Sequence, residues 1–399
     1  MRLLVSCLAS SMLLFLAPMA ATAQSDFATC LARLEARALQ EGHDTEAVNA
    51  VLSRAEYLPR VISADRQQAE FTQTFTDYYS KRVTAKRVAS GRQLRSNHRD
   101  LLDALQREYG VPSQYLVALW GLETNFGGYL GNLTIPSALA TLACDNRRSK
   151  FFADELITLI GIVGGGDMGV DELIGSWAGA MGHMQFMPST FAAHAVDGDG
   201  DGKRNLYSSL ADALGSGAHY LVKSGWQQGF KWGREVILSD SFDYAQAGSH
   251  NWRPLSYWRN AGIRDVHGEL IPPLTIESAI LLPSGHSGPA FLVYENFRVL
   301  MRWNRSEFYA LSVGRLADRI AGAGKLHTPL PKRRIATQDV MNIQRHLATL
   351  GYAVGSADGI LGPATRKAIR EFQQAHNLIA DGYPNPEVVQ KIDAITGRS

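Results

Sequence analysis

The sequence predicts a mainly α-helical protein with a small β insertion, followed by a smaller helical unit. Apolar residues recur at helical spacing through residues 25–110 and again through residues 151–163. Residues 229–293 are instead rich in proline and glycine, and they contain short apolar runs typical of strands. A segment with two glycines and two prolines, residues 322–334, separates this first body from residues 335–399, where helical spacing returns.

The elements of the first body follow from their boundaries. The helical pattern of the N-terminal stretch ends at Gly110. Pro112 then opens the next helix, because proline is favoured near the first turn, and this helix carries the apolar residues 115–122. The later elements that we expect are a helix at 151–163, strands at 236–238 and 279–282, and a helix at 307–320.

Residues 335–399 have the pattern of a small helical domain. Apolar residues between Val340 and Leu350 lie on one helical face, and a second helix follows Gly362 and Pro363. About 60 residues is small for an independent domain but sufficient. The segment 322–334 ends in a basic cluster that is expected to keep a linker solvated.

Composition excludes several classes of protein. The 399 residues are 45% hydrophobic and 20% charged, so the chain can bury a sizeable core and is not disordered throughout. The net charge of +2 gives no electrostatic basis for binding nucleic acid. No apolar run beyond the extreme N-terminus is long enough to span a bilayer, which excludes a polytopic membrane protein.

Residues 1–23 have the pattern of a cleaved export signal. Arg2 precedes a short apolar stretch, and the small residues Ala21 and Ala23 mark a cleavage site before Gln24. The alternative is a membrane anchor, for which the apolar stretch is short. A cysteine at position 7 precedes the apolar segment rather than following it, so a lipoprotein signal is rejected.

Removal of this signal leaves two cysteines, Cys30 and Cys144. An even pair in an exported chain favours one disulfide, and the alternative is two buried free thiols. No Cys-x-x-Cys pattern supports a structural zinc site.

One carboxylate, Glu123, follows seven uncharged and largely apolar residues. A helix that is apolar on every side is buried, so Glu123 is expected at the C-terminal end of a buried helix. The helix dipole and desolvation both disfavour an anion there, and the carboxyl should hold its proton to higher pH. Such a group suits a general acid. The alternative is a glutamate that caps a surface turn.

Glycines alternate with small and aromatic residues in residues 175–189. Glycine permits close approach of a ligand to the backbone, and Ser176 and Gln185 offer hydrogen bonds. His183 could be a base, but no serine or cysteine nucleophile motif accompanies it. The alternative for this segment is a tight packing site between helices.

Residues 197–208 begin like an EF-hand calcium loop. Aspartates occupy positions 1, 3 and 5 and glycine occupies position 6, but position 12 is a serine instead of glutamate. Asp212, four residues after this serine, could replace the missing glutamate only in a longer loop. A Ca²⁺ site and a solvated acidic turn both remain open. The candidate ligands are Asp197, Asp199, Asp201, Lys203 and Asp212.

Residues 294–309 combine aromatic rings with side-chain amides, which suit a sugar because sugars present both apolar faces and hydroxyls. The alternative is an ordinary helix and turn whose aromatic residues are buried in the core.

Together these four segments closely resemble the lytic murein transglycosylase B family, from about Thr29 to Ile320. The most specific matches are Gly121 to Gly127 and Ala178 to Ser189. Residues 335–399 resemble a peptidoglycan-binding domain of three helices, with matches that include Asp358 to Thr365.

The resemblance implies a lysozyme-like α+β catalytic domain at 24–321 and a peptidoglycan-binding domain at 335–399. It also implies a lytic murein transglycosylase of membrane-bound or soluble type, a carbon–oxygen lyase in the periplasm. Such an enzyme cleaves the β-1,4 bond between N-acetylmuramic acid and N-acetylglucosamine in peptidoglycan glycan strands and leaves a 1,6-anhydromuramic acid end. Glu123 would be the sole acid/base, no cofactor would be required, and Ca²⁺ would be structural. The implied sugar-binding residues are Tyr78, Ser176, Gln185, Trp303, Asn304 and Tyr309.

A single carboxylate agrees with this chemistry. Ordinary glycosidases flank the bond with two carboxylates, whereas an intramolecular hydroxyl needs no second carboxylate to activate water. Two rival hypotheses are a hydrolytic muramidase, which shares the fold, and a non-catalytic wall-binding protein.

Overall fold

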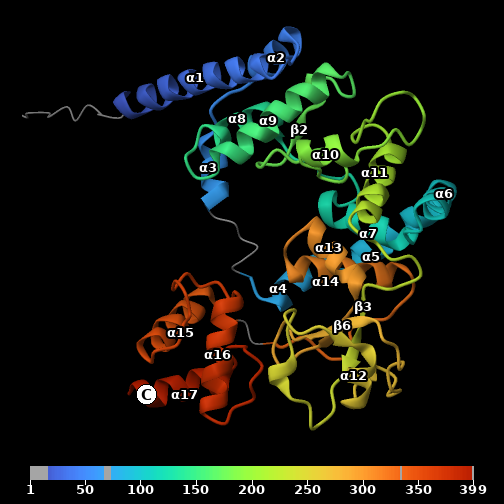
Figure 1. The fold of residues 1–399 in the computed structure, drawn as a ribbon, viewed down its shortest axis with the longest axis vertical. Coiled ribbons are helices and arrows are strands. Elements are labelled where there is room, and N and C mark those ends of the chain that lie inside the picture. The colour runs from blue at the N-terminus through green and yellow to red at the C-terminus, as the bar shows by residue number, and fades with distance from the viewer. Residues whose placement is uncertain (1–16, 67–72, 333–334, 398–399) are drawn as a thin grey trace, which may run out of the picture. The chain divides into compact units, whose positions relative to one another are not determined.

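The structure, a computed structural model, describes residues 17–66, 73–332 and 335–397, which belong to two units. The first unit comprises Met1–Arg66, Gly131–Met181 and Phe186–Ala192, and the second comprises the rest of the chain (Figure 1). Residues 1–16 of the predicted export signal lie outside the described residues. None of the described helices has both the length and the apolarity needed to cross a membrane.

The first unit is built around helices α8 and α9, which pack against each other. All nine residues of α8 are buried, as expected for a helix made of small and apolar residues. The predicted helix at 151–163 is confirmed as α9. The elements of this unit are α1 (Ala17–Gln40), α2 (Thr45–Leu52), α3 (Pro59–Arg66), β1 (Leu133–Thr134), α8 (Ile135–Ala143), α9 (Ser149–Gly164), the 3₁₀ helix η2 (Val170–Glu172), β2 (Ile174–Gly175) and most of α10 (Pro188–His194).

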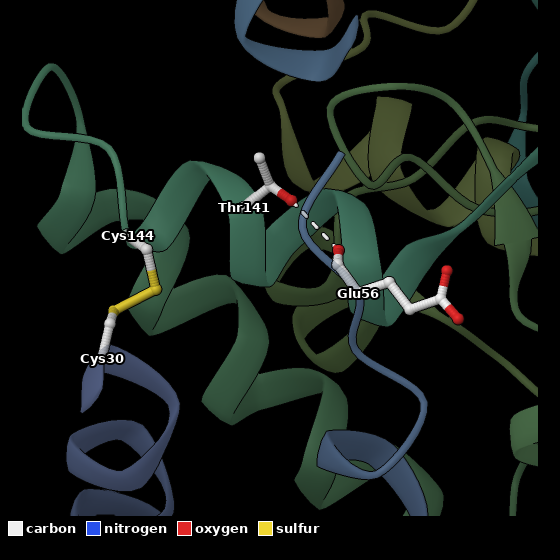
Figure 2. The surroundings of a disulfide bond; sticks show 4 residues. All are labelled: Cys30, Glu56, Thr141 and Cys144. Carbon is white, nitrogen blue, oxygen red and sulfur yellow. Dashed lines mark hydrogen bonds between the residues drawn. A yellow bond between two sulfur atoms is a disulfide. The ribbon is translucent and has the colours of Figure 1, made fainter. Parts of the chain in front are cut away.

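The predicted disulfide is confirmed within this unit. Cys30 on α1 is bonded to Cys144, the residue that caps the end of α8, with Cα atoms 5.9 Å apart (Figure 2). On the same helix, the Thr141 hydroxyl donates to the backbone oxygen of Glu56 at 3.3 Å and accepts the backbone N–H of Leu58 at 3.0 Å. The chain between α2 and α3 is therefore held along α8.

Helices α7 and α14 pack against each other in the second unit, and α5 packs against both. The predicted helix at 307–320 is confirmed with the same ends. The helices of this unit are α4 (Phe75–Arg82), α5 (Ala85–Asn97), α6 (Arg99–Tyr109), α7 (Ser113–Thr124), α11 (Leu210–Lys223), η3 (Tyr244–Gln246), α12 (Leu255–Asn260), α13 (Glu295–Trp303), α14 (Glu307–Ile320), α15 (Thr337–Thr349), α16 (Pro363–Ala375) and α17 (Pro386–Thr396).

The β insertion is a five-stranded antiparallel sheet of order β4-β6-β7-β3-β5. Its strands are β3 (Gly233–Ile237), β4 (Arg253–Pro254), β5 (Arg264–Asp265), β6 (Glu277–Leu281) and β7 (Ala290–Val293). Strands β3 and β6 confirm the strands predicted at 236–238 and 279–282, with ends that differ by a few residues. Trp232, just before β3, joins the sheet to α14, because its indole N–H donates to Asp318 at 3.2 Å and its ring fills the space that a side chain at Gly314 would need.

The last three helices, α15 to α17, surround a core of their own, as predicted for a small helical domain. This core is formed by Ile343, Leu347, Val354, Ala368, Ile369, Phe372, Val388 and Ile392. The domain also bonds to the loop between β6 and β7, because the His286 ring lies 2.7 Å from the carboxylate of Asp381. The hydrogen bond to Asp381 raises the pKa of His286 more than burial lowers it.

The segment 322–334 bonds to the sheet at two backbone groups, while most of its described residues are exposed, as in a solvated linker. The backbone N–H groups of His327 and Thr328 donate to the carboxylate of Glu235 on β3, at 2.9 and 2.7 Å. Glu235 is buried, and a buried carboxylate requires donors. The first half of the segment is therefore bonded to the sheet, while residues 333–334 lie outside the described residues.

Loss of the disulfide should destabilise the first unit. A bridge that closes a loop of 114 residues restricts the unfolded chain, and removal of a native bridge typically costs about 2–5 kcal/mol. We expect the double variant Cys30→Ala, Cys144→Ala to melt at a lower temperature than the oxidised protein. Reductant should lower the melting temperature of the wild type but not of the variant. A wild-type protein that is insensitive to reductant would contradict this role.

Candidate active site

Helix α7 carries Glu123 as its penultimate residue, as predicted. Nine of the twelve residues of α7 are buried, whereas Glu123 is half-buried. The helix stops at Asn125, which adopts a left-handed conformation with φ of 51°. The Glu123 carboxyl group therefore lies at the end of the buried helix, where the chain becomes partly exposed.

Two aromatic side chains donate hydrogen bonds to one oxygen of this carboxyl group. The indole N–H of Trp303, the last residue of α13, lies 2.8 Å from Oε1 of Glu123. The hydroxyl of Tyr309, in the first turn of α14, donates to the same oxygen. The structure therefore gives Trp303 a contact to Glu123 in addition to the sugar binding that the resemblance implies.

The turn between α13 and α14 positions both donors. Ser306 caps α14 by accepting the backbone N–H of Tyr309 at 3.3 Å. The Trp303 ring packs edge-to-face on Tyr220, with centroids 5.0 Å apart, and the Tyr220 hydroxyl donates to the backbone oxygen of Arg302 at 2.8 Å. The indole plane is thus held from α11 as well as from its own helix.

The chain leaves α7 through three consecutive left-handed residues, Asn125, Phe126 and Gly127, with φ of 51°, 62° and 78°. Such a run costs free energy at the two residues that are not glycine. The Phe126 ring packs over Gly121, where a Cβ atom would lie 2.7 Å from the ring. The close approach of Phe126 therefore explains why position 121, inside a buried helix, is a glycine.

His183 is part of the support for this turn. The indole N–H of Trp120 donates to Nδ1 of His183 at 3.0 Å, so this nitrogen acts as an acceptor. Burial lowers the pKa of His183 despite a hydrogen bond to the Tyr207 backbone. The hydroxyl of Thr124 lies 3.1 Å from the His183 backbone oxygen and accepts the Gly127 N–H at 3.0 Å. The His183 imidazole therefore has a structural role, because it accepts a hydrogen bond from Trp120 of α7.

Gln185 and Ser176 are held by their own turns in different units. Gln185 has a left-handed backbone with φ of 50°, and its amide donates to the backbone oxygens of Leu130 and Gly182 at 3.2 and 3.0 Å. In the first unit, the Ser176 hydroxyl accepts the backbone N–H groups of Ala178 and Ala180 at 3.2 and 3.0 Å. Both side chains are half-buried.

The two remaining predicted sugar contacts have contrasting exposure. Asn304 is half-buried and caps the end of α13. Tyr78 on α4 is fully buried, with the Arg82 guanidinium 4.0 Å from its ring centre and the Phe308 ring 6.1 Å away. In this conformation Tyr78 packs inside the second unit, next to the helix that carries Tyr309.

The acidic loop brings together three of its aspartates. Oxygens of Asp197, Asp199 and Asp212 all lie within 4.8 Å of one another. Asp212 is buried in the first turn of α11, where it accepts the backbone N–H groups of Gly198 and Asn205 at 2.8 and 2.7 Å. This loop is therefore longer than an EF-hand loop.

The other two predicted ligands, Asp201 and Lys203, lie further along the loop. Oδ1 of Asp201 accepts the backbone N–H of Lys203 at 2.8 Å. The side chain of Asp201 is not among the three carboxylates that gather in this part of the described chain.

Sequence reasoning missed the supporting residues Trp120, Thr124 and Phe126. One available signal was Gly121, because a glycine inside a buried apolar helix indicates that another part of the chain approaches closely. The hydrogen bond from Trp303 had no local signal, since the partners are 180 residues apart in sequence.

Two known domain families match the chain. Residues 26–318 match the transglycosylase SLT domain, and residues 336–392 match a putative peptidoglycan-binding domain. Among curated proteins, the membrane-bound lytic murein transglycosylase B of Escherichia coli is 30% identical over 304 residues, which cover 71% of this chain and 80% of that protein.

Solved structures give the same relationship. SltB3 from Pseudomonas aeruginosa, in complex with NAG-anhNAM-pentapeptide, is 39% identical and superposes with a TM-score of 0.87 over 92% of this chain and 99% of that chain. The E. coli lytic transglycosylase Slt35, in complex with calcium, is 28% identical, with a TM-score of 0.63 over 75% of this chain and 93% of that chain.

Proposed function

This chain belongs to the transglycosylase SLT family and is an enzyme that acts on peptidoglycan, and we propose that Glu123 is its single acid/base. The bond that it cleaves is the β-1,4 linkage between N-acetylmuramic acid and N-acetylglucosamine. The observation that carries the proposal is the half-buried Glu123 carboxyl at the end of α7, held by Trp303 and Tyr309.

Glu123 acts twice in the proposed reaction. As an acid it gives its proton to the glycosidic oxygen, so the bond to C1 of the muramic acid breaks and the leaving sugar departs as an alcohol. As a base it then takes the proton of the C6 hydroxyl while that oxygen bonds to C1. The carboxyl group recovers its proton, and the product ends in 1,6-anhydromuramic acid with no water consumed.

One carboxyl group suffices because the nucleophile belongs to the substrate. Residues 113–131 contain Glu123 as their only acidic residue. A hydrolytic glycosidase needs a second carboxylate to activate water or attack the sugar. The C6 hydroxyl instead has the high effective concentration of an intramolecular neighbour.

Several polar side chains of the second unit are suited to sugar binding. We propose that Gln185, Asn304 and Tyr309 contact the sugars around the scissile bond, together with Ser176 of the first unit and Tyr78. Trp303 would offer its ring to a sugar while its N–H bonds to Glu123. The bonds that fix Gln185 and Ser176 support this proposal, because a side chain held in place loses little entropy when a ligand binds.

We further propose that the acidic loop binds a structural Ca²⁺ ion. Carboxylate oxygens are the ligands that this ion prefers, and three of them converge in Asp197, Asp199 and Asp212. The related E. coli Slt35 was solved in complex with calcium, which supports the proposal. The backbone oxygen of Lys203 and the carboxylate of Asp201 remain candidate ligands. The ion would neutralise the clustered charge and takes no part in the chemistry.

Residues 1–23 are proposed to direct export to the periplasm, where peptidoglycan and an oxidising environment are found together. The disulfide in the first unit is consistent with such an environment. The proposed domains are a catalytic domain at 24–321 and a peptidoglycan-binding domain at 335–399, joined by residues 322–334. The separate core of the last three helices supports this division.

Glu123→Gln should preserve the fold and lower turnover by at least about 100-fold, because an amide cannot donate and recover the proton. Mass spectrometry of digested peptidoglycan gives the rate of release of anhydro products, which are lighter than hydrolysed ones by one water. The matched control is Glu277→Gln, the same change at an exposed site on β6. A folded Glu123→Gln protein with more than a tenth of wild-type turnover would refute the assignment.

Added Ca²⁺ at millimolar concentration should raise the melting temperature by several degrees, since an ion that binds only the folded state stabilises it. Asp199→Ala should abolish the rise, and Asp240→Ala, which removes an exposed carboxylate outside the loop, should preserve it. Mg²⁺ at the same concentration serves as the ionic control. Equal shifts with both ions, or none with Ca²⁺, would indicate a plain acidic turn.

Removal of the small domain should slow the digestion of intact sacculi more than that of short soluble muropeptides, because a tether raises local concentration on an insoluble polymer. We place the cut after Lys332 rather than Ala321, so that His327 and Thr328 still satisfy Glu235.

The matched control keeps the small domain attached. His286→Gln loses the ion pair with Asp381 and should leave both digestion rates close to those of the wild type. Equal slowing of the truncated protein on both substrates would mean that the small domain completes the active site.

A further inference from the structure

Helix α6 and the loop between α11 and β3 line a pocket near the start of α7. Its volume is about 610 Å³, and its lining residues are Asp103, Gln106, Arg107, Gly110, Pro112, Gln228 and Gly229. Glu123 lies ten residues beyond the first residue of α7, which at about 1.5 Å per residue places it about 15 Å away along the helix axis. The pocket is therefore distinct from the candidate active site.

A buried amide holds the loop that forms one wall of this pocket. Asn296 on α13 accepts the backbone N–H of Gln227 at 2.7 Å, and it donates to the backbone oxygens of Gln227 and Phe230, both at 2.9 Å. The two residues between them, Gln228 and Gly229, line the pocket. Because the loop is fixed before a ligand arrives, little conformational entropy is lost when one binds.

The side chains that line the pocket include polar groups that the protein leaves open. Asp103, Arg107 and Gln228 are exposed, and within the described part of the chain none of these three side chains is engaged in a hydrogen bond or ion pair. The Gln228 side chain lies against Gly110, where a Cβ atom would be 2.8 Å from its amide carbon. Asp103 and Arg107 lie one turn apart on α6, so their charges cancel. A pocket without net charge favours a neutral polar ligand over an ion.

An aromatic ring follows these groups in the sequence. Phe230 comes directly after Gly229, and 41% of its surface is exposed. A sugar presents hydroxyl groups that bind planar polar side chains, and it presents C–H faces that pack on an aromatic ring. Carboxylate, guanidinium, amide and phenyl groups in one place are therefore suited to a sugar ring.

We propose that this pocket is a second glycan-binding site, which takes an N-acetylated sugar of a peptidoglycan strand away from the cleavage point. The inference rests on the proposed function, which supplies a glycan as the ligand. Asp103 accepts a hydrogen bond from a sugar hydroxyl, and Arg107 and Gln228 donate to oxygens of the same sugar. A second weak contact raises the affinity for strands long enough to reach both sites, and it adds nothing for short ones.

The binding test places a 4-fluorophenylalanine label at Phe230 and follows its ¹⁹F NMR signal. It uses the Glu123→Gln protein, so that turnover does not complicate the titration. We expect chitotetraose, a β-1,4-linked tetramer of N-acetylglucosamine, to shift the signal saturably at millimolar concentration. The same label at Phe151, whose side chain is similarly exposed in the first unit, should show no shift.

Two double variants of α6 form the matched pair. Asp103→Ala with Arg107→Ala removes the two charged pocket groups and should weaken chitotetraose binding about tenfold. Arg99→Ala with Asp100→Ala removes the same two charges from exposed positions of the same helix outside the pocket, and it should leave binding unchanged. With Glu123 intact, the pocket variant should digest long glycan strands about threefold more slowly than the wild type, and short soluble muropeptides at the wild-type rate.

Three results would overturn the second site. They are the absence of a saturable shift with chitotetraose, an equal shift in the pocket variant, and a shift produced by a free stem pentapeptide in place of the sugar. Turnover by the Glu123→Gln protein would instead refute the acid/base role and leave the binding result standing, because the titration does not depend on the chemistry of Glu123.

Discussion

A carboxyl group at the end of a helix that is buried on nearly every side must receive its hydrogen-bond donors from other parts of the chain, because its own helix end offers only carbonyl oxygens. Glu123 receives them from residues 180 and 186 positions away. The site therefore exists only when α14 packs against α7 and α13 packs against α14. That packing depends in turn on the β insertion, since Trp232 secures α14 to the sheet through Asp318 and the space at Gly314.

The turn after Glu123 is also held rigidly. Asn125 and Phe126 are held in a conformation that most residues avoid. Their free-energy cost is offset by the packing of Phe126 over Gly121 and by the bond from Gly127 to Thr124. Position 121 must be a glycine because a side chain there would occupy the space of the Phe126 ring. Gly121 thereby helps to hold the turn that follows the Glu123 carboxyl group.

Local patterns were sufficient to predict α7, the position of Glu123 at its end, and the full length of α14, because helical periodicity and helix ends are encoded within a few turns. Contacts between distant segments could not be predicted in this way. The burial of Tyr78, for example, depends on the position of α14, whose Phe308 ring lies beside it. The bonding of the segment after Ala321 to Glu235 likewise depends on a strand that lies about 90 residues earlier.

The link between α1 and α8 also has a consequence for the order in which the molecule matures. The sequence contains three cysteines, so three pairings are available while Cys7 remains attached, and only one of them joins the two helices. A chain that crosses a membrane from its N-terminus exposes Cys30 to oxidants 114 residues before Cys144 arrives. If residues 1–23 are the cleaved leader proposed above, their early removal takes the wrong partner away during that interval. The fidelity of oxidation would then depend on the timing of proteolysis, without a need for later reshuffling of an incorrect bridge.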